Sequence, residues 1–231
     1  MPSPEEPLPE GAEKAAAVRS MFDAIAPRYD LVNRVMTFGL DVGWRRRTVR
    51  SLGVARGSRV LDIACGTGDL CRALRTAGHT VIGLDVSEGM LRAAKTDAPL
   101  ILGDALALPV GDGIFDGITC GFALRNVVSL ERLFAEMARA LRPGGRVALL
   151  EVARPERAWL RAGHSIYFNK VVPRIGGLLS DRAAYSYLPR SAAYLPERAE
   201  VLAMLRAAGF NYLEVKTPPP GAAQIITGTR S

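Results

Sequence analysis

One stretch decides how this chain folds: Arg59-Val60-Leu61-Asp62-Ile63-Ala64-Cys65-Gly66-Thr67-Gly68-Asp69. Its first six residues form a short apolar run that predicts a buried strand, and residues 70–77 have the spacing of a helix. The glycines between them let the backbone approach a ligand closely, while the helix N-terminus presents free N–H groups. The stretch therefore predicts a strand, a loop for a nucleotide cofactor and a helix.

The same alternation of strand and helix continues along the chain. Ser87 is a suitable cap for a second helix, to about Lys95, and a third is expected over 130–141. Strands are predicted at 80–85, 100–102, 115–121 and, after a Pro-Gly-Gly break, 146–152, and a hairpin at 212–216 and 224–227 closes the sheet. This order predicts an α/β fold, a doubly wound seven-stranded Rossmann-like sheet.

The flanking segments depart from this alternation. Residues 1–12 are rich in proline and acid, so we expect a disordered tail before a single domain over 13–231. Residues 18–52 predict two or three N-terminal helices, broken at Pro27 and at 39–41. Residues 156–194 carry aromatic and aliphatic side chains among basic ones without a strand pattern, which indicates a cap insertion. A last helix over 197–208 ends at Gly209, which suits a left-handed C-cap.

Bulk composition restricts the compartment and the partners. Neither a secretory signal nor an apolar run long enough to span a bilayer is present, so we expect a cytoplasmic protein. Three cysteines without paired spacing predict buried thiols and neither a metal site nor disulfides. The formal charge of +7 is compatible with nucleic acid, with an anionic membrane surface or with no partner. Charge alone does not choose between them.

Two further acids follow predicted strands. Asp85 ends the second strand, where a carboxylate can accept hydrogen bonds from ribose hydroxyls, and Asp104 follows the third, where it can accept from an adenine amino group. An aspartate at 69, beside the second glycine, would repel a diphosphate, whereas Asp62 and Asp69 suit a ligand with a sulfonium and an ammonium. This favours S-adenosylmethionine over a dinucleotide. The alternative is that these motifs are only tight turns of an α/β fold.

Several motifs together resemble a known family. The class-wide ones are residues 61–69, 85–91, 103–105 with 108–109, and 122–126, and residues 141–146 match the family as well. The more specific ones are Tyr29-Asp30-Leu31-Val32-Asn33, Leu124-Arg125-Asn126 and Tyr185-Ser186-Tyr187-Leu188-Pro189-Arg190-Ser191. From about residue 21 to the C-terminus the chain resembles the ubiquinone/menaquinone biosynthesis C-methyltransferases, which are class I S-adenosylmethionine-dependent enzymes.

The resemblance implies transfer of a methyl group from S-adenosylmethionine to a ring carbon of a polyprenylated quinol, demethylmenaquinol in the menaquinone branch. No metal is required. The cofactor would be bound by residues of the glycine loop and of the following strand ends: Asp62, Gly66, Thr67, Gly68, Asp85, Val86, Met90, Asp104, Ala105 and Gly121.

The resemblance also implies the catalytic residues. Arg125 and Asn126 would hold the quinol oxygen or a bridging water and stabilise its negative charge. Tyr29 and Asp30 would lie over the cofactor, with Asp30 as a candidate general base through water. The alternatives are a salt bridge at Arg125, a helix cap at Asn126, and ordinary helix packing for the tyrosine and the aspartate.

Three positions depart from the family pattern. Relatives usually carry histidine where this chain has Asp41, serine where it has Gly121 and histidine where it has Ile226. Any role of those side chains cannot be carried over to this chain, and the departures weaken the case for one particular quinol.

The expected partner is a lipophilic quinol whose isoprenoid chain enters under the cap, with transient contact to a membrane surface at the inner face. The alternative for the cap is a buried helix pair with a solvated basic face. Rival functions are methylation of another lipophilic acceptor, such as a 2-polyprenyl benzoquinol, a tocopherol-like compound or a phenol, and a non-catalytic cofactor-binding module. Nucleic acid is not expected, since no Asn-Pro-Pro-Tyr-like tetrapeptide follows the fourth strand. A homodimer is left open.

Overall fold

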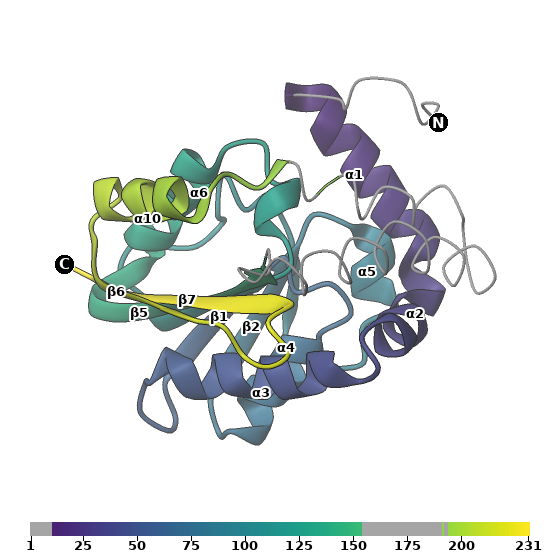
Figure 1. Cartoon of the computed structure of the whole chain (residues 1–231), viewed down its shortest axis with the longest axis horizontal. Helices are drawn as coiled ribbons and strands as arrows, with labels where there is room; N and C mark the ends of the chain where they lie inside the picture. The colour runs from purple at the N-terminus through teal and green to yellow at the C-terminus, as the bar shows by residue number, and fades with distance from the viewer. Residues whose placement is uncertain (1–10, 154–190, 192–193) are drawn as a thin grey trace.

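A computed structural model describes residues 11–153, 191 and 194–231 of the chain. Its centre is one seven-stranded sheet in the order β3-β2-β1-β4-β5-β7-β6 (Figure 1). The strands are β1 (Arg59–Ile63), β2 (Thr80–Asp85), β3 (Leu100–Leu102), β4 (Phe115–Gly121), β5 (Leu141–Val152), β6 (Phe210–Lys216) and β7 (Ala223–Arg230). The predicted α/β class and the number of strands are confirmed.

Strand direction places the loops that follow the strands at one edge. β1 to β5 are parallel, with Asp62 of β1 opposite Gly83 on one side and Thr119 on the other. Only β7 is antiparallel to both its neighbours, β5 and β6, which is the predicted closing hairpin. The strand order reverses between β1 and β4, so the carboxyl ends of β1, β2 and β4 meet at the switch point where doubly wound sheets bind ligands.

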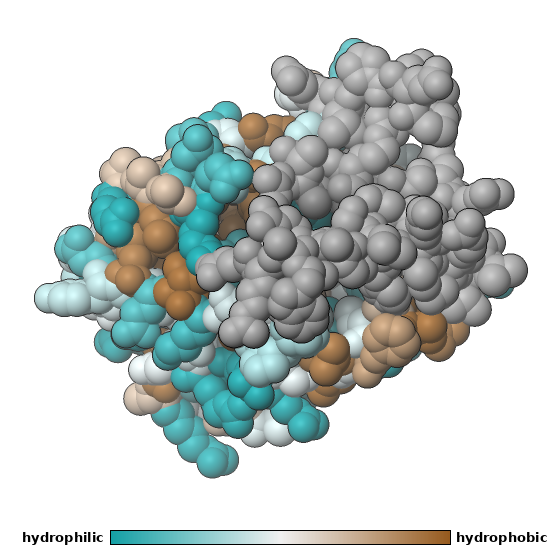
Figure 2. Space-filling view, in the orientation of Figure 1, coloured by the Kyte–Doolittle hydropathy of each residue, from teal (hydrophilic) through white to brown (hydrophobic). Residues whose placement is uncertain are grey.

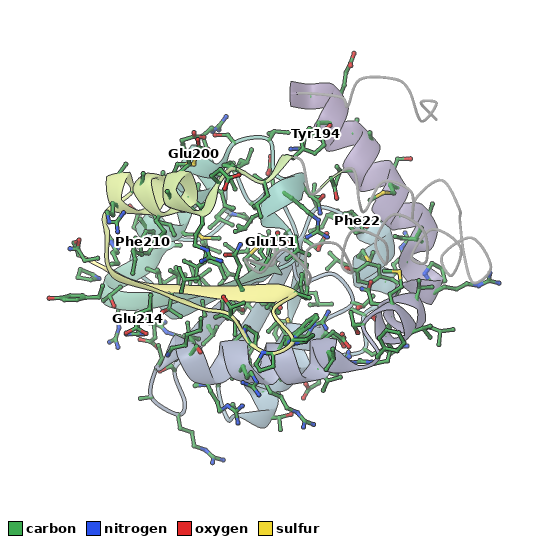
Figure 3. All side chains as sticks on the ribbon, in the orientation of Figure 1. Phe22, Glu151, Tyr194, Glu200, Phe210 and Glu214 are labelled. Atoms are coloured by element: carbon green, nitrogen blue, oxygen red, sulfur yellow. The ribbon has the colours of Figure 1, made fainter. Side chains whose placement is uncertain are left out.

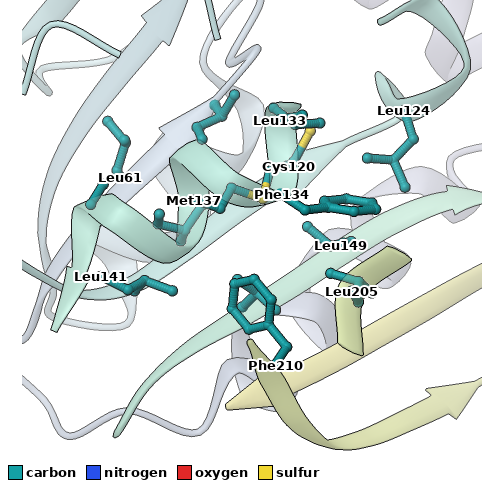
Figure 4. Close-up of a cluster of buried hydrophobic side chains, with 14 of the residues drawn as sticks. Leu61, Cys120, Leu124, Leu133, Phe134, Met137, Leu141, Leu149, Leu205 and Phe210 are labelled. Atoms are coloured by element: carbon teal, nitrogen blue, oxygen red, sulfur yellow. The ribbon is translucent and has the colours of Figure 1, made fainter. Parts of the chain in front are cut away.

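Helices cover both faces of the sheet and bury its apolar residues (Figure 1). α6 (Leu130–Ala140) and α10 (Arg198–Ala207) lie on one face, where Phe134, Leu205 and Phe210 pack against Leu149 of β5 (Figure 4). α3 (Leu40–Leu52) and α4 (Asp69–Thr76) cover the other face. Burial of large apolar side chains on both faces stabilises the sheet and makes its edge a rigid support for the loops.

The N-terminal helices follow the prediction with two corrections. α1 spans Gly11–Ile25, a 3-10 turn spans Ala26–Arg28, and α2 spans Tyr29–Met36. The break at Pro27 is confirmed, whereas the second break falls at residues 37–39 and not at 39–41, since Leu40 and Asp41 already belong to α3. Gly39 takes a left-handed conformation (φ +75°) directly before α3. The expected tail is too long by two residues, since residues 11 and 12 already belong to α1. Residues 1–10 lie outside the described residues.

Further boundaries differ from the prediction. α5 spans only Glu88–Arg92 and does not reach Lys95, because the Lys95 N–H donates to the Thr67 carbonyl (3.0 Å) and turns the chain onto the cofactor loop. β5 already begins at Leu141, and the Pro-Gly-Gly segment forms a bulge in it, where the register against β4 shifts. The first helix of the sheet spans 69–76 where 70–77 was expected.

The cap predicted over 156–194 lies outside the described residues, except for Ser191 and Tyr194. The three cysteines are buried free thiols, as predicted. Within the described part of the chain, no helix combines the length and apolar character that crossing a membrane requires.

Candidate cofactor and acceptor site

A cavity of about 180 Å³ opens at the carboxyl ends of β1, β2, β3 and β4. Seven of the ten residues proposed for the cofactor line it: Gly66, Asp85, Val86, Met90, Asp104, Ala105 and Gly121. Two of the four proposed catalytic residues, Tyr29 and Asn126, line it as well. The fold therefore brings the predicted cofactor loop and part of the predicted acceptor site into one space.

Asp85 organises the loops on two sides of this cavity. One carboxylate oxygen accepts the Gly66 N–H (2.7 Å) and the other accepts the Ser87 N–H (2.8 Å). Burial raises the pKa of Asp85 from its ordinary value, although these backbone N–H groups oppose that shift. A carboxylate offers about four lone-pair sites, so Asp85 keeps acceptor capacity for ribose hydroxyls.

The loop after β3 also lines the cavity. The Asp104 carboxylate accepts the Leu106 N–H with one oxygen (2.9 Å), which leaves the other oxygen for a ligand amino group. A methyl group at Gly103 would lie 3.1 Å from Leu84 and 3.3 Å from Pro109, so glycine keeps this loop close to β2. Two carboxylates and small residues along the cavity fit the hydroxyls, the adenine and the positive charge of S-adenosylmethionine.

Asp62 and Asp69 do not line the cavity, against the expectation that both face the cofactor. Asp62 is fully buried and accepts hydrogen bonds from Thr119 Oγ1 (2.7 Å) and Cys71 Sγ (3.3 Å). Burial raises its pKa to about 6. Asp69 instead pairs with Arg34, Arg45 and Arg72. Both carboxylates support the loop from behind.

Thr67 and Gly68 likewise support the loop without lining the cavity. Thr67 is buried, and its hydroxyl donates to the Asp30 carboxylate, which also lies 3.5 Å from the Lys95 ammonium. Gly68 has φ +83°, and a methyl group there would lie 2.7 Å from Thr96. Asp30 is also absent from the cavity lining. The candidate general base therefore fastens α2 to the cofactor loop.

Tyr29 of α2 and Asn126 of the turn after β4 both line the cavity. Burial raises the pKa of the Tyr29 hydroxyl, while a hydrogen bond with Asn33 and the positive charges of Arg45 and Arg125 oppose that shift. The Asn126 backbone N–H donates to the Ala123 carbonyl (2.8 Å), which closes a 3-10 turn over Leu124–Asn126. Ser129, and not Asn126, caps α6, so the alternative of a helix cap at Asn126 is wrong.

Arg125 is buried and forms a salt bridge with Glu151 of β5, as the alternative interpretation of this residue expected. Its Nε donates to Ser191 Oγ at 3.2 Å. Arg125 is not among the described residues that line the cavity, although its charge reaches the Tyr29 hydroxyl.

The sequence did not reveal how much of α1 borders the cavity. Ala15, Val18 and Phe22 line it, and Figure 3 shows Phe22 on the side of the molecule where α1 and α5 lie. Their spacing follows one helix face, but an apolar face predicts burial without saying against what. The remaining lining residues, to which no role was assigned from the sequence, are Ala64, Leu84, Gly103, Leu106, Phe122, Ala123, Val127 and Val128.

The three residues that depart from the family pattern lie in three different environments: a network of charges, the wall of the cavity and the apolar core. Asp41 is buried and pairs with Arg34 (2.9 Å) and with Arg45, so this network compensates its charge. Gly121 lines the cavity, and a methyl group there would lie 2.7 Å from Leu70, so the wall is closed to a larger side chain unless Leu70 moves. Ile226 belongs to the apolar core. Among the described residues, no cluster of potential metal ligands is present.

This sheet, with β7 antiparallel and an acidic cavity at its parallel carboxyl edge, defines a class I S-adenosylmethionine-dependent methyltransferase. Residues 10–230 match the ubiE/COQ5 methyltransferase family, and the chain belongs to it. A demethylmenaquinone methyltransferase of Roseiflexus castenholzii is 43% identical, covering 96% of this chain and 97% of that protein. A ubiquinone/menaquinone biosynthesis C-methyltransferase of Geobacter sulfurreducens is 38% identical, covering 94% and 90%.

Solved structures share the fold at low identity. A Thermotoga maritima S-adenosylmethionine-dependent methyltransferase, described as a possible histamine N-methyltransferase, has a TM-score of 0.67 at 21% identity and covers 93% of this chain and all of that one. A phosphoethanolamine N-methyltransferase of Haemonchus contortus, solved with S-adenosylmethionine, has a TM-score of 0.61 at 16% identity and covers 81% and 52%.

Proposed function

We propose that this enzyme methylates a ring carbon of a polyprenylated quinol, converting demethylmenaquinol to menaquinol. The observation that carries the proposal is the similarity, along nearly the whole chain, to demethylmenaquinone methyltransferases of several bacteria. The cavity supports it, since its lining includes Tyr29, Phe122 and Asn126 besides the acids Asp85 and Asp104. These three residues offer aromatic rings and polar groups to a quinol.

Bound S-adenosylmethionine supplies a methyl group that its sulfonium has already activated, so the protein has to orient the acceptor and raise its electron density. Loss of the quinol hydroxyl proton to water makes the neighbouring ring carbon nucleophilic. This carbon bonds the methyl group as the carbon–sulfur bond breaks and S-adenosylhomocysteine leaves. The ring carbon then gives its own proton to water, which restores the aromatic ring as a quinol anion, and this anion takes back one proton to form the methylated quinol. Asn126 and Tyr29 hold the quinol oxygen, and the Arg125 charge stabilises its anion.

In this proposal Asp30 keeps the cofactor loop in place and is not the base, because its carboxylate is committed to Thr67 and Lys95. Asp85 and Asp104 take the ribose and the adenine. Val86 and Met90 provide apolar contact beside them.

The first test is transfer of a labelled methyl group from S-adenosylmethionine to reduced demethylmenaquinone, with a 2-polyprenyl benzoquinol in parallel. We expect transfer to the naphthoquinol, and Arg125→Ala should abolish it while cofactor affinity, measured by calorimetry, stays within about threefold. Transfer to both quinols would extend the function to the benzoquinone branch. Transfer to neither, with cofactor bound, would contradict the proposal.

We also propose transient contact with an anionic membrane surface, where such a substrate resides. The cap to which the sequence assigned this contact lies outside the described residues. Support comes instead from the corner between α2 and α3, where Leu31, Val35, Phe38 and Leu40 are exposed, Phe38 by 77%. Figure 2 shows hydrophobic residues toward the lower right, over the position of this corner in Figure 1. Along α3, this corner is followed by three exposed arginines, Arg46, Arg47 and Arg50.

A further inference from the structure

The end of β5 carries a carboxylate that the proposed chemistry does not use. Glu151 is 0% exposed, and it lies in the interior of the molecule (Figure 3), paired in register with Gln224 of β7. A buried carboxylate without partners is strongly unfavourable, because desolvation penalises its charge. The sequence reasoning did not single this residue out, since one acid in an apolar strand has no motif of its own.

The partners of Glu151 come from its own strand and from the turn that holds Asn126. One oxygen accepts the Val152 N–H (2.8 Å) and pairs with the Arg125 guanidinium, and the other lies 3.4 Å from the Arg125 backbone nitrogen. Glu151 therefore contacts both the side chain and the main chain of Arg125. Two such contacts restrict the rotation of the guanidinium and the position of the turn together.

A second contact to the guanidinium comes from Ser191, which follows β5 in the chain. Arg125 Nε donates to Ser191 Oγ at 3.2 Å, and Ser191 is fully buried. The Arg125 Nη2 donates to no described residue. The Nε and Nη1 groups of the guanidinium are thus held by Ser191 and Glu151.

The turn between these contacts forms part of the cavity wall. Phe122, Ala123 and Asn126 all line the cavity, and so does Tyr29, on which the charge of Arg125 acts. A shift of the turn by a fraction of an ångström would move the amide of Asn126 and the positive charge together. Such small displacements are costly for a reaction that depends on alignment.

We propose that Glu151 is a positioning residue, which with Ser191 orients Arg125 and the Asn126 turn toward the acceptor oxygen. This inference rests on the proposed function. Glu151 touches no reacting atom and acts through Arg125. It follows that loss of its charge, with its shape kept, lowers the rate of methyl transfer without changing how the cofactor binds.

The test uses the full-length protein and the isosteric variant Glu151→Gln, with kcat, KM, cofactor affinity and thermal midpoint measured at temperatures well below unfolding. We expect kcat to fall about 100-fold, with cofactor Kd within about threefold. Glu136→Gln is the matched control, since Glu136 also combines an arginine partner, Arg139, with a backbone N–H, from Leu108, and is not part of the site. Its kcat should equal that of the wild type.

Chemical rescue of Arg125→Ala distinguishes a positioning role of Glu151 from a purely structural one. Guanidinium ion added at millimolar concentration should partly restore kcat to Arg125→Ala, because Glu151 anchors it, and should fail to do so in Arg125→Ala/Glu151→Gln. Ser191→Ala, which removes one hydroxyl, should lower kcat about tenfold. This variant replaces Glu151→Gln as the test if Glu151→Gln does not fold.

Three results would overturn the inference: an unchanged kcat in Glu151→Gln, a loss of cofactor binding and thermal stability in step with kcat, or rescue by guanidinium without Glu151. If the wild-type enzyme methylates no quinol at all, the proposed function is wrong. That result depends only on the wild type, so it is distinguishable from a failure of the inference about Glu151.

Discussion

At the scale of single residues, three carboxylates of the glycine loop and the strand ends lie in different surroundings, although each follows or ends a strand in the sequence. Asp85 lines the cavity, Asp62 is buried behind it, and Asp69 is neutralised by three arginines. Asp62 lies between β2 and β4, where burial dominates its titration and raises its pKa to about 6. The ordinary value is 3.8.

This shift predicts a pH dependence of stability. Because the pKa of Asp62 is higher in the folded than in the unfolded chain, its stabilising contribution is complete below about pH 3.8 and is lost as the pH rises to about 6. In Asp62→Asn this loss is absent. We therefore expect the unfolding free energy of the variant, relative to the wild type, to increase by roughly 3 kcal/mol between pH 4 and pH 7.

Urea unfolding of both proteins across this pH range measures the difference. The broken hydrogen bonds to Thr119 and Cys71 add an offset that does not depend on pH, so only the slope is diagnostic. A constant difference between the two proteins would contradict the assignment.

At the scale of elements, α1 closes the cavity because it is fastened to the loop after β2. The Asp23 carboxylate accepts the Ser87 hydroxyl (2.6 Å) and the Gly89 N–H (2.9 Å). A methyl group at Gly89 would lie 2.9 Å from the Asp23 backbone, so glycine permits the close approach of α1 and α5. At the other end of α1, the buried Lys14 donates to the Val127 carbonyl (3.0 Å) and lies over the Tyr194 ring.

We expect Asp23→Ala to loosen this closure. Removal of a carboxylate that accepts two hydrogen bonds costs about 1 to 3 kcal/mol, so amide exchange in α1 should accelerate roughly tenfold or more while β1 and β4 exchange as before. Dissociation of S-adenosylmethionine should accelerate as well. Hydrogen exchange by mass spectrometry and stopped-flow fluorescence measure the two effects. Glu13→Ala, an exposed position of the same helix, is the control, and equal exchange in both variants would contradict the role of Asp23.

At the scale of the whole molecule, exposed apolar side chains are unevenly distributed. The corner of α2 and α3 holds four of the eight large apolar side chains that are exposed among the described residues. Tyr212 is on the edge strand β6, which is labelled at the left of Figure 1, whereas α2 is at the right. Apolar side chains beside arginines are typical of surfaces that bind anionic membranes.

The contact predicts how variants bind vesicles. Phe38→Ser combined with Leu40→Ser should lower binding to vesicles containing 30% phosphatidylglycerol by roughly fivefold at low salt, because less apolar surface is buried. Co-sedimentation measures the bound fraction. Tyr212→Ser removes an equally exposed aromatic ring elsewhere and should bind like the wild type. Equal binding by all three proteins would place the contact elsewhere, and a wild type that ignores the vesicles would contradict it.

The sequence by itself determined the sheet, the glycine loop and the acids at the strand ends. Apolar periodicity is local, and a parallel order of strands necessarily brings the residues that follow them to one edge, which is why Gly66, Asp85 and Asp104 meet. The resemblance added Tyr29 and Asn126, which line the same cavity.

Only the tertiary structure decided which charges pair and what closes the site. Arg125 and Glu151 are 26 residues apart, Asp23 and Ser87 are 64 apart, and Asp69 is matched by arginines of other helices. Periodicity says that such residues are buried or exposed, but not against which partner. The choice of partner depends on how the helices pack on the sheet, because a buried charge is tolerated only where packing delivers an opposite one.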